Sequence, residues 1–349
     1  MSRHMARLIA LSVIMYTVLW SGGILAPRAA TAATYYVATT GSDAHPCTQA
    51  QPCQTIAQGL RSLRSGDTLY LRGGTYTEGI NTNTQPIPSG TSWSSATVIA
   101  AYPGETVILR PRGGWSVVGI GGDASVQYII LDGLIIDAIN VNTRGTGTSA
   151  EGYGLTLGCC DGAHHIRFQN GEVKNAWSEN VELMGSFNEV MHSKIYDSRE
   201  GYGFYVSTGN NHLIEGNEIY NNAGYAVQIY SGYYSGPGQG STDNHIVRNN
   251  RMYNNGFELG YGAITVGKGR NCHVYNNLIY DNFGGIEVND HSTDQQIYDN
   301  TIHNNQWGIS ISASSTGAVI ENNLVYQNVI AIDDNGIDTV SSNNRMLEP

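Results

Sequence analysis

The chain has 349 residues, enough for one large domain or two small ones, and charged residues make up only 13% of it. Its net charge of −11 argues against nucleic acid as a partner, because phosphates are bound by surfaces rich in Lys and Arg. Glycine is abundant, at 43 residues, which suits a fold with many tight turns.

Residues 1–33 have the pattern of a secretory signal peptide. Arg3 and Arg7 precede an apolar run at 8–20, and small residues at 30–32 form a cleavage site. The alternative is a membrane anchor, but the run is shorter than the roughly 20 residues that span a bilayer. We therefore predict a secreted, periplasmic or cell-surface protein, without membrane association after cleavage, whose mature part is one monomeric domain at 34–349.

The mature chain opens with a predicted strand at 35–37, a short amphipathic helix at 55–64 and a strand at 68–71. Less regular strands are expected at 97–101, 106–109 and 115–120. Between the first strand and the helix, Cys47 and Cys53 lie six residues apart in a polar loop, and we predict that they form a disulfide. Adjacent Cys159 and Cys160, and Cys272, have the context of buried thiols.

One hexapeptide, with apolar first and last residues around a polar turn, recurs eight times. It occupies residues 130–135, 168–173, 190–195, 214–219, 247–252, 274–279, 297–302 and 320–325. The steps between copies are 38, 22, 24, 33, 27, 23 and 23 residues. A period near 23 with insertions predicts a solenoid whose coils pack only on their neighbours, and the helix at 55–64 would cover its first coil. Alternating strands of four to six residues between Asn and Gly turns make this an all-β fold of stacked parallel strands.

Three columns of residues recur at fixed places in the coils. Asparagines at turns are predicted to bond from coil to coil; they are Asn222, Asn255, Asn282, Asn305 and Asn328. Outward rings either form a platform for sugars or only stabilise a sheet; they are Tyr196, Tyr220, Tyr253, Tyr280, His303 and Tyr326. His212, His245 and Cys272 share one register position, as a soft-metal ladder or as stacked core residues.

The third strand of each coil carries the most varied outward residues, and two insertions at 231–244 and 255–262 flank it. In chain order the outward residues are Thr156, Glu182, Tyr205, Gln228, Thr265, Glu287 and Ser310. Just beyond them lie Tyr230, Lys268, Asn289, Asp290 and His291. Loops beside a rigid solenoid are where a groove is usually built. Glu182 and Glu287, four coils or roughly 19 Å apart, cannot be a hydrolytic carboxylate pair.

The opening stretch, from Tyr-Tyr-Val-Ala-Thr-Thr-Gly-Ser-Asp at 35–43 to Gly-Asp-Thr-Leu-Tyr-Leu-Arg-Gly-Gly-Thr-Tyr at 66–76, resembles secreted right-handed parallel β-helix proteins of the pectate-lyase-like superfamily. Together with the repeats, the resemblance covers nearly the whole mature chain. It implies a single right-handed parallel β-helix with an N-terminal helical cap.

Residues 262–277, Gly-Ala-Ile-Thr-Val-Gly-Lys-Gly-Arg-Asn-Cys-His-Val-Tyr-Asn-Asn, resemble the coils that carry the catalytic residues of alginate and chondroitinase-B-type lyases. The resemblance implies that Lys268 stands in the column of their basic lysine, and that Asn289, 21 residues on, stands where they have an arginine. It also implies Ca²⁺ as a cofactor, although their acidic ligands have no clear match here. Family-9 pectate lyases place an Asp cluster before the lysine, where this chain has Glu258.

These observations favour a polysaccharide lyase that cleaves an acidic, uronic-acid polysaccharide by β-elimination. The predicted catalytic residues are Lys268, His291, Asn289 and Tyr230. The predicted substrate-binding residues are Glu182, Tyr205, Gln228, Thr265, Glu287 and Asp290. A desolvated lysine can serve as the base that elimination needs, whereas the alternative for Lys268 is a solvated turn residue. Two other functions stay open: a non-catalytic glycan-binding or surface-structural β-helix, and a glycoside hydrolase.

Overall fold

The computed structural model describes residues 32–121, 126–141, 152–159, 162–231 and 242–347, all within the compact unit Ala32–Pro349. The predicted signal peptide lies outside the described residues except at 32 and 33. Cys160 and residues 232–241 of the first insertion also lie outside them, as does the side chain of Cys159, so these predictions are untested. No described helix is long and apolar enough to cross a membrane.

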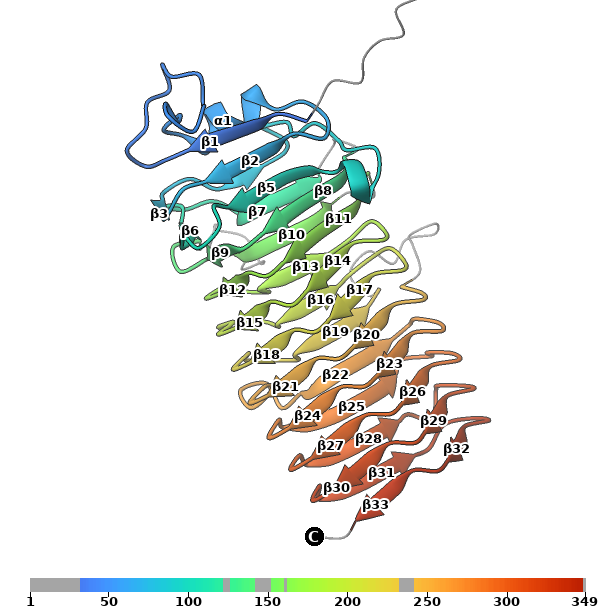
Figure 1. The fold of residues 1–349 in the computed structure, drawn as a ribbon. Helices are drawn as coiled ribbons and strands as arrows, with labels where there is room; N and C mark the ends of the chain where they lie inside the picture. Colours follow the sequence, from blue (N-terminus) through green and yellow to red (C-terminus); the bar gives the residue numbers. More distant parts are fainter. Residues whose placement is uncertain (1–31, 122–125, 142–151, 160–161, 232–241, 348–349) are drawn as a thin grey trace, which may run out of the picture. The chain divides into compact units, whose positions relative to one another are not determined.

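Within the described residues the chain forms three parallel sheets, and each coil adds one strand to each sheet (Figure 1). Sheet A has 12 strands: β1 (Thr34–Val37), β2 (Thr68–Leu71), β5 (Thr97–Ala101), β8 (Gln127–Asp132), β11 (His164–Gln169), β14 (Glu189–Met191), β17 (Leu213–Glu215), β20 (Ile246–Arg248), β23 (His273–Tyr275), β26 (Gln296–Tyr298), β29 (Val319–Glu321) and β32 (Val340–Ser342). Sheet B has 11: β3 (Gly74–Tyr76), β6 (Val107–Leu109), β9 (Leu134–Asp137), β12 (Glu172–Lys174), β15 (Lys194–Tyr196), β18 (Glu218–Tyr220), β21 (Arg251–Tyr253), β24 (Leu278–Tyr280), β27 (Thr301–His303), β30 (Leu324–Tyr326) and β33 (Arg345–Leu347). Sheet C has 10: β4 (Ile80–Asn81), β7 (Ser116–Gly121), β10 (Tyr153–Cys159), β13 (Val181–Leu183), β16 (Phe204–Val206), β19 (Val227–Tyr230), β22 (Gly262–Gly267), β25 (Gly284–Asn289), β28 (Trp307–Ile311) and β31 (Ile330–Asp334). The predicted parallel β-helix is confirmed.

Each hexapeptide joins a strand of sheet A to a strand of sheet B. The copy predicted at 130–135 is wrong by one residue, because Leu131 and Ile136, and not Ile130 and Ile135, pair with the core residues of the next copy. In the copy at 274–279, Val274 lies on β23 and Ile279 on β24, and both side chains are buried in the core between the sheets. Asn276 between them has a φ of 54°, a left-handed conformation that Asn tolerates better than most residues. The alternation of inward apolar and outward polar residues therefore produces one continuous core.

The N-terminal end of the core is covered by the helix α1 (Ile56–Ser62), as predicted. Thr55 caps the helix by accepting the amide of Gln58, and Ile56 and Leu60 are buried. The helix has seven residues and ends at Ser62, so it is shorter than the predicted 55–64. The short strands β3 and β4, and the 3-10 turn η1 (Trp93–Ser95), were not predicted.

The predicted disulfide between Cys47 and Cys53 is present, with the two Cα atoms 4.6 Å apart. It fastens the loop before the helix to β1, because the carbonyl of Cys47 accepts the amide of Tyr36 and the amide of Cys53 donates to the carbonyl of Tyr36. Cys272 is a free, buried thiol, also as predicted.

The asparagine turns form two ladders of hydrogen bonds along the stack. In the ladder between sheets B and C, the Nδ2 of Asn222 donates to Oδ1 of Asn255, and that of Asn255 donates to Oδ1 of Asn282, both at 2.9 Å. The second ladder, between sheets A and B, was not predicted as a column; it comprises Asn217, Asn250, Asn277, Asn300, Asn323 and Asn344. These buried amides satisfy one another and hold the turns in register.

His212, His245 and Cys272 lie between sheets C and A, in one register column that is fully buried. The two rings stack with centroids 5.0 Å apart, and Nδ1 of His245 accepts the amide of His212. Burial lowers the pKa of His212 to about 4. This geometry is that of stacked core residues, because the ring nitrogens on this edge bond to backbone amides.

Candidate functional site on sheet C

The outward residues of sheet C form a single column, as the sequence predicts. Strand pairing joins them in the order Asn81, Gly119, Thr156, Glu182, Tyr205, Gln228, Thr265, Glu287, Ser310 and Asp333. We call this the polar column. Four steps separate Glu182 from Glu287, so these two carboxylates are about 19 Å apart and do not act on the same bond.

Several members of the polar column are engaged with each other or with neighbouring coils. Glu182 is buried and accepts a hydrogen bond from Oγ of Ser207 at 3.2 Å. The phenol of Tyr225 donates to Oε2 of Glu287 at 3.1 Å. Burial, followed by the negative charge of Glu287, raises the pKa of Tyr225 well above its ordinary range. The middle of sheet C is therefore a hydrogen-bonded surface on which the tyrosine phenols stay neutral.

Lys268, Tyr230 and Asn289 come together at the end of the sheet C strands. Tyr230, Gly267 and Asn289 are register partners on β19, β22 and β25. A Cβ at position 267 would lie 2.6 Å from Cδ2 of Tyr230 and 2.8 Å from Oδ1 of Asn289, so the glycine lets both side chains close over it. Nζ of Lys268 then sits 4.8 Å from the centre of the Tyr230 ring, a cation–π contact.

The ammonium of Lys268 is exposed, and no carboxylate of the described residues lies within ion-pair distance of it. Hydrogen bonds from backbone amides join the turn of Lys268, and the turn of Asp290 and His291, each to the next coil. The amide of Lys268 donates to the carbonyl of Asp290, and the amide of His291 donates to Oγ of Ser314. All three residues have φ between 51° and 63°, so they form matching left-handed turns on consecutive coils. A substrate chain could reach Nζ of Lys268 without displacing a protein anion.

A second outward column, at the start of the sheet C strands, was missed. It runs through Ser116, Tyr153, Glu179, Tyr202, Tyr225 and Trp307, each three residues before a member of the polar column. Tyr261 joins it by stacking on Tyr225 with ring centroids 4.6 Å apart. The constant offset of three residues was the signal available in the sequence. It was hidden because these positions lie at the turn, where strand alternation breaks down.

Glu179 is the acidic residue of this second column. Its side chain is buried, and Oγ of Ser178 donates to its Oε2 at 2.5 Å. Burial raises the pKa of Glu179, outweighing the hydrogen bond from Ser178 that lowers it. The pKa of Tyr202 rises to about 12, first through burial and then through the neighbouring Tyr261 and Glu179.

The buried polar atoms without a hydrogen-bond partner within the described residues include several on strands of sheet C. Among them are Oγ of Ser116, Oγ1 of Thr156, Oγ1 of Thr265, Oδ1 of Asn289 and Nε1 of Trp307. An unpaired buried polar group costs about 1–3 kcal/mol. A polar ligand lying on this face would offer partners to these atoms.

The aromatic column of sheet B is present as predicted, but its geometry differs from that of a sugar platform. Tyr196, Tyr220 and Tyr253 stack with centroids 4.8 and 5.1 Å apart and planes within 4° of parallel, and the stack continues to Tyr326. Sugars bind aromatic residues through the ring faces. Because each ring already covers the faces of its neighbours, this column stabilises the stack and leaves mainly ring edges to solvent.

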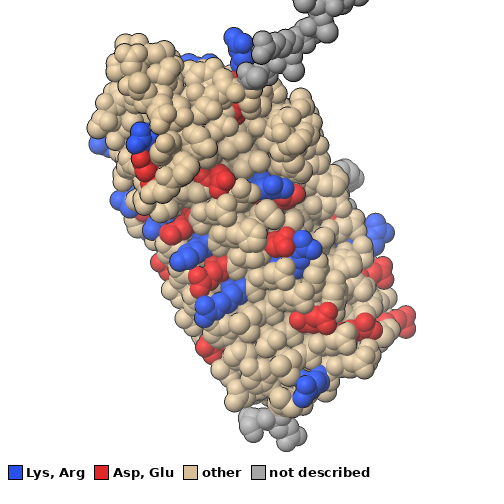
Figure 2. All heavy atoms as spheres, viewed as in Figure 1, with Lys and Arg blue, Asp and Glu red and all other residues tan. Residues whose placement is uncertain are grey.

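The described residues contain no group of three or more His, Cys, Asp or Glu side chains arranged to hold a metal ion. Figure 2 shows Lys and Arg beside Asp and Glu over the middle of the face in view, and a run of acidic side chains at its lower right edge. Pairs such as Arg167–Glu189 at 2.6 Å and Arg248–Glu215 at 2.8 Å account for the mixed charges in the middle.

Comparison with known proteins places these observations in a family. A family model described as "Right handed beta helix region" matches residues 139–262 and 179–347, together more than half of the chain. Pectate lyase PEL9 of Emericella nidulans is 28% identical over 225 residues, which are 60% of this chain and 52% of that protein. This chain thus spans about half the length of that relative.

Solved structures show the same fold. The pectate lyase Pel9A matches with a TM-score of 0.59 and 16% identity, covering 90% of this chain and 78% of that one. The GH136 lacto-N-biosidase from Eubacterium ramulus matches with a TM-score of 0.65 and 14% identity, covering 90% of this chain and 68% of that one. At these identities the likeness concerns the fold, which a lyase and a hydrolase share.

Proposed function

Because this chain belongs to the right-handed β-helix family and has a pectate-lyase-like fold, we propose that it is a secreted, carbohydrate-active protein, and more closely a polysaccharide lyase. Its substrate would be an acidic polysaccharide containing uronic acid, bound along sheet C. The observation that carries the proposal is the exposed ammonium of Lys268, held over Tyr230 beside the amide of Asn289 and free of any ion pair among the described residues.

In β-elimination, a base takes the proton from the carbon that bears the carboxylate, the bond to the next sugar's oxygen breaks, and that oxygen gains a proton. A bound chain that covers Lys268 would desolvate it and favour the neutral amine, which can take the proton. In this proposal the amide of Asn289 donates to the substrate carboxylate, and Tyr230 or His291 protonates the leaving oxygen. Glu182, Tyr205, Gln228, Thr265, Glu287 and Asp290 would hold the flanking sugars.

The test is the ultraviolet absorbance of unsaturated product from pectate, alginate, hyaluronan and dermatan, each with and without Ca²⁺ and a chelator. Lys268→Ala should lower the rate by about 10² or more, the usual effect of losing a catalytic base. Lys194→Ala, which removes an exposed lysine from sheet B, is the matched control and should keep full activity. The lyase proposal fails if no substrate yields unsaturated product, or if Lys268→Ala matches the wild type.

The same panel separates the two rival functions. New reducing ends without unsaturated product would indicate a hydrolase. For a non-catalytic binding protein that uses the rings of sheet B, Tyr253→Leu should weaken polysaccharide binding. We expect it to lower stability by roughly 1 kcal/mol through lost stacking and to leave binding unchanged, because the ring faces are already covered.

A further inference from the structure

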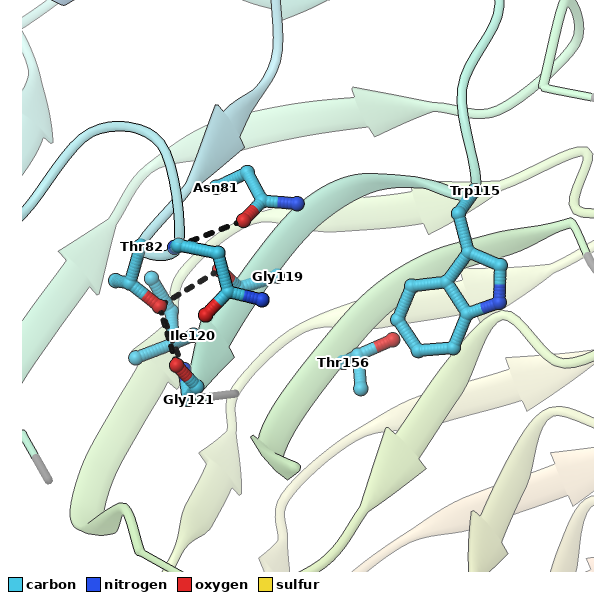
Figure 3. A pocket seen from close by; sticks show the side chains of 8 residues that line it. Asn81, Thr82, Trp115, Gly119, Ile120, Gly121 and Thr156 are labelled. Carbon is cyan, nitrogen blue, oxygen red and sulfur yellow. Dashed lines mark hydrogen bonds between the residues drawn. The ribbon is translucent and has the colours of Figure 1, made fainter. Parts of the chain in front are cut away.

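A hollow of about 50 Å³ interrupts the polar column near its N-terminal end. Figure 3 shows Trp115 on one side of it, Asn81 and Thr82 on the other, and Thr156 between them. Strand pairing places Asn81, Gly119 and Thr156 in one row of the polar column, so the hollow lies in line with Glu182, Tyr205 and the residues beyond.

The hollow exists because position 119 has no side chain. A Cβ there would lie 3.1 Å from Oγ of Ser116 and 3.9 Å from Nδ2 of Asn81, so it would enter this space without meeting the backbone. Thr82 takes no part as a donor to a ligand, since its hydroxyl bonds the carbonyl and amide of Gly121 at 2.8 Å. The amide nitrogen of Asn81 faces the space over Gly119.

Two of the unpartnered polar atoms of sheet C border this place. Thr156 is fully buried, lines the hollow and has no partner for Oγ1, and Oγ of Ser116 is also buried and unpartnered. A buried hydroxyl without a partner costs about 1–3 kcal/mol, which a hydrogen bond to a ligand would recover. Together with the aromatic wall of Trp115, this is the composition of a sugar subsite: one apolar ring and a few convergent polar groups.

The size and charge of the hollow limit what it can take. One water needs about 10–15 Å³ by this measure, so the hollow accommodates a few non-hydrogen atoms and not a whole sugar ring. None of the residues that line it is charged. A hydroxyl, hydroxymethyl or acetyl group therefore fits, whereas a carboxylate would lose its hydration without gaining a cation.

We propose that the hollow over Gly119 is a distal subsite that takes an uncharged substituent of the bound polysaccharide, whose ring leans on Trp115. Five strand spacings, about 24 Å, separate Gly119 from Thr265, the row that leads to Lys268. A sugar residue of an extended chain is about as long as one strand spacing. The polysaccharide then runs along the stack, and about five sugar residues reach from Lys268 to the hollow. This direction of the chain rests on the function proposed for Lys268, whereas the subsite itself does not.

The test measures binding of oligogalacturonates and oligoalginates by calorimetry, using one length shorter and one longer than this span. Gly119→Val fills the hollow and should weaken the longer oligomers about tenfold while leaving the shorter ones unchanged, as loss of one hydrogen-bonded contact predicts. Thr156→Val keeps the shape and removes the hydroxyl. It should weaken binding of the longer oligomers to a similar extent. It should also raise the melting temperature of the free protein, because the hydroxyl it removes is buried without a partner. A hydroxyl with only a structural role would not affect binding.

Gly113→Val is the matched control, since a Cβ there meets nothing within 4 Å, and its binding should equal that of the wild type. The subsite proposal is overturned if Gly119→Val and Thr156→Val bind long and short oligomers like the wild type, or if neither series binds the wild type. Length-dependent loss of binding without unsaturated product would leave the subsite standing and reject the lyase. Normal elimination by the wild type, with no effect of Gly119→Val or Thr156→Val on binding, would support the lyase and reject the subsite.

Discussion

At the scale of single residues, burial decides what a polar side chain on this solenoid does. Lys268 and His291 are exposed in turns that follow strands of sheet C. Glu179, at the opposite end of the sheet C strands, is buried among aromatic residues and has a raised pKa. His212, buried between sheets C and A, shows the opposite effect on a base: its pKa falls to about 4. Titratable side chains that are exposed can therefore contact a ligand, whereas those buried in the core remain uncharged.

This neutrality predicts how stability depends on pH. Below about pH 6.5 the unfolded chain binds a proton at residue 212 that the folded chain does not, so the free energy of unfolding falls as the pH drops to about 4 and then levels off. The loss from His212 should be about 3 kcal/mol. His245, whose pKa is also lowered by burial and by His212, adds to it in the same direction. Urea unfolding between pH 7 and 4 measures the slope.

His212→Asn should flatten that slope, because an amide suits this column: Asn188 and Gln295 occupy equivalent turns and bond the neighbouring backbone amides. His45→Asn, which changes an exposed histidine, should leave the slope unchanged. An unaltered slope in His212→Asn would show that this ring does not carry the pH dependence.

At the scale of elements, ladders of identical side chains hold the coils in register. From β12 onward, the strands of sheets A and B are only three residues long, so the hydrogen bonds of the strands alone do little to fix the register of the coils. The asparagine ladders add buried bonds at each turn between them. The aromatic ladder of sheet B extends the same principle to the surface, where stacking along the axis consumes the ring faces.

An interior member of a ladder should matter more than its last member. Asn277→Ala removes bonds to the amide and Nδ2 of Asn250, the carbonyl of Val247 and Oδ1 of Asn300, all between 2.9 and 3.0 Å. Because these groups are buried, we expect a loss of roughly 2–4 kcal/mol in the free energy of unfolding.

The control for this prediction is Asn344→Ala at the end of the same ladder. Asn344 accepts two bonds from Asn323 at 2.9 Å but is half-buried, so water can replace it, and the cost should be about 1 kcal/mol. Denaturant unfolding of both variants gives the comparison. Equal losses in the free energy of unfolding for the two variants would mean that burial does not increase the contribution of the ladder hydrogen bonds.

At the scale of the whole molecule, the two ends of the described solenoid differ. The first coil is covered by α1 and pinned by the Cys47–Cys53 disulfide. In the last described coil, Met346 is 57% exposed, whereas its register partner Val325 in the preceding coil is fully buried. In a stack where each coil contacts only its neighbours, stability should therefore fall toward β31, β32 and β33.

Amide hydrogen exchange tests this gradient. Amides in β31, β32 and β33 should exchange at least about tenfold faster than those in β22 and β25, because opening the last coil exposes little additional apolar surface. Uniform protection along the stack would contradict it and would indicate that the solenoid opens as one cooperative unit.

The sequence by itself determined the coil, the register and the polar column. The physical reason is that parallel strands in successive coils pair residue for residue. The number of residues between two repeats therefore determines which side chains are neighbours. Counting from one hexapeptide to the next therefore placed Glu182, Tyr205 and Glu287 in one row and separated the two carboxylates.

Only the tertiary structure decided which parts of that row can meet a ligand. The hollow over Gly119 arises in N-terminal coils of irregular spacing, where no repeat predicts that Asn81 and Thr156 flank a glycine. The burial of Glu179, the closure of Tyr230 and Asn289 over Gly267, and the covered ring faces of sheet B depend on side-chain packing across coils. Register places residues in rows, whereas packing between the rows sets their exposure, their partners and hence their chemistry.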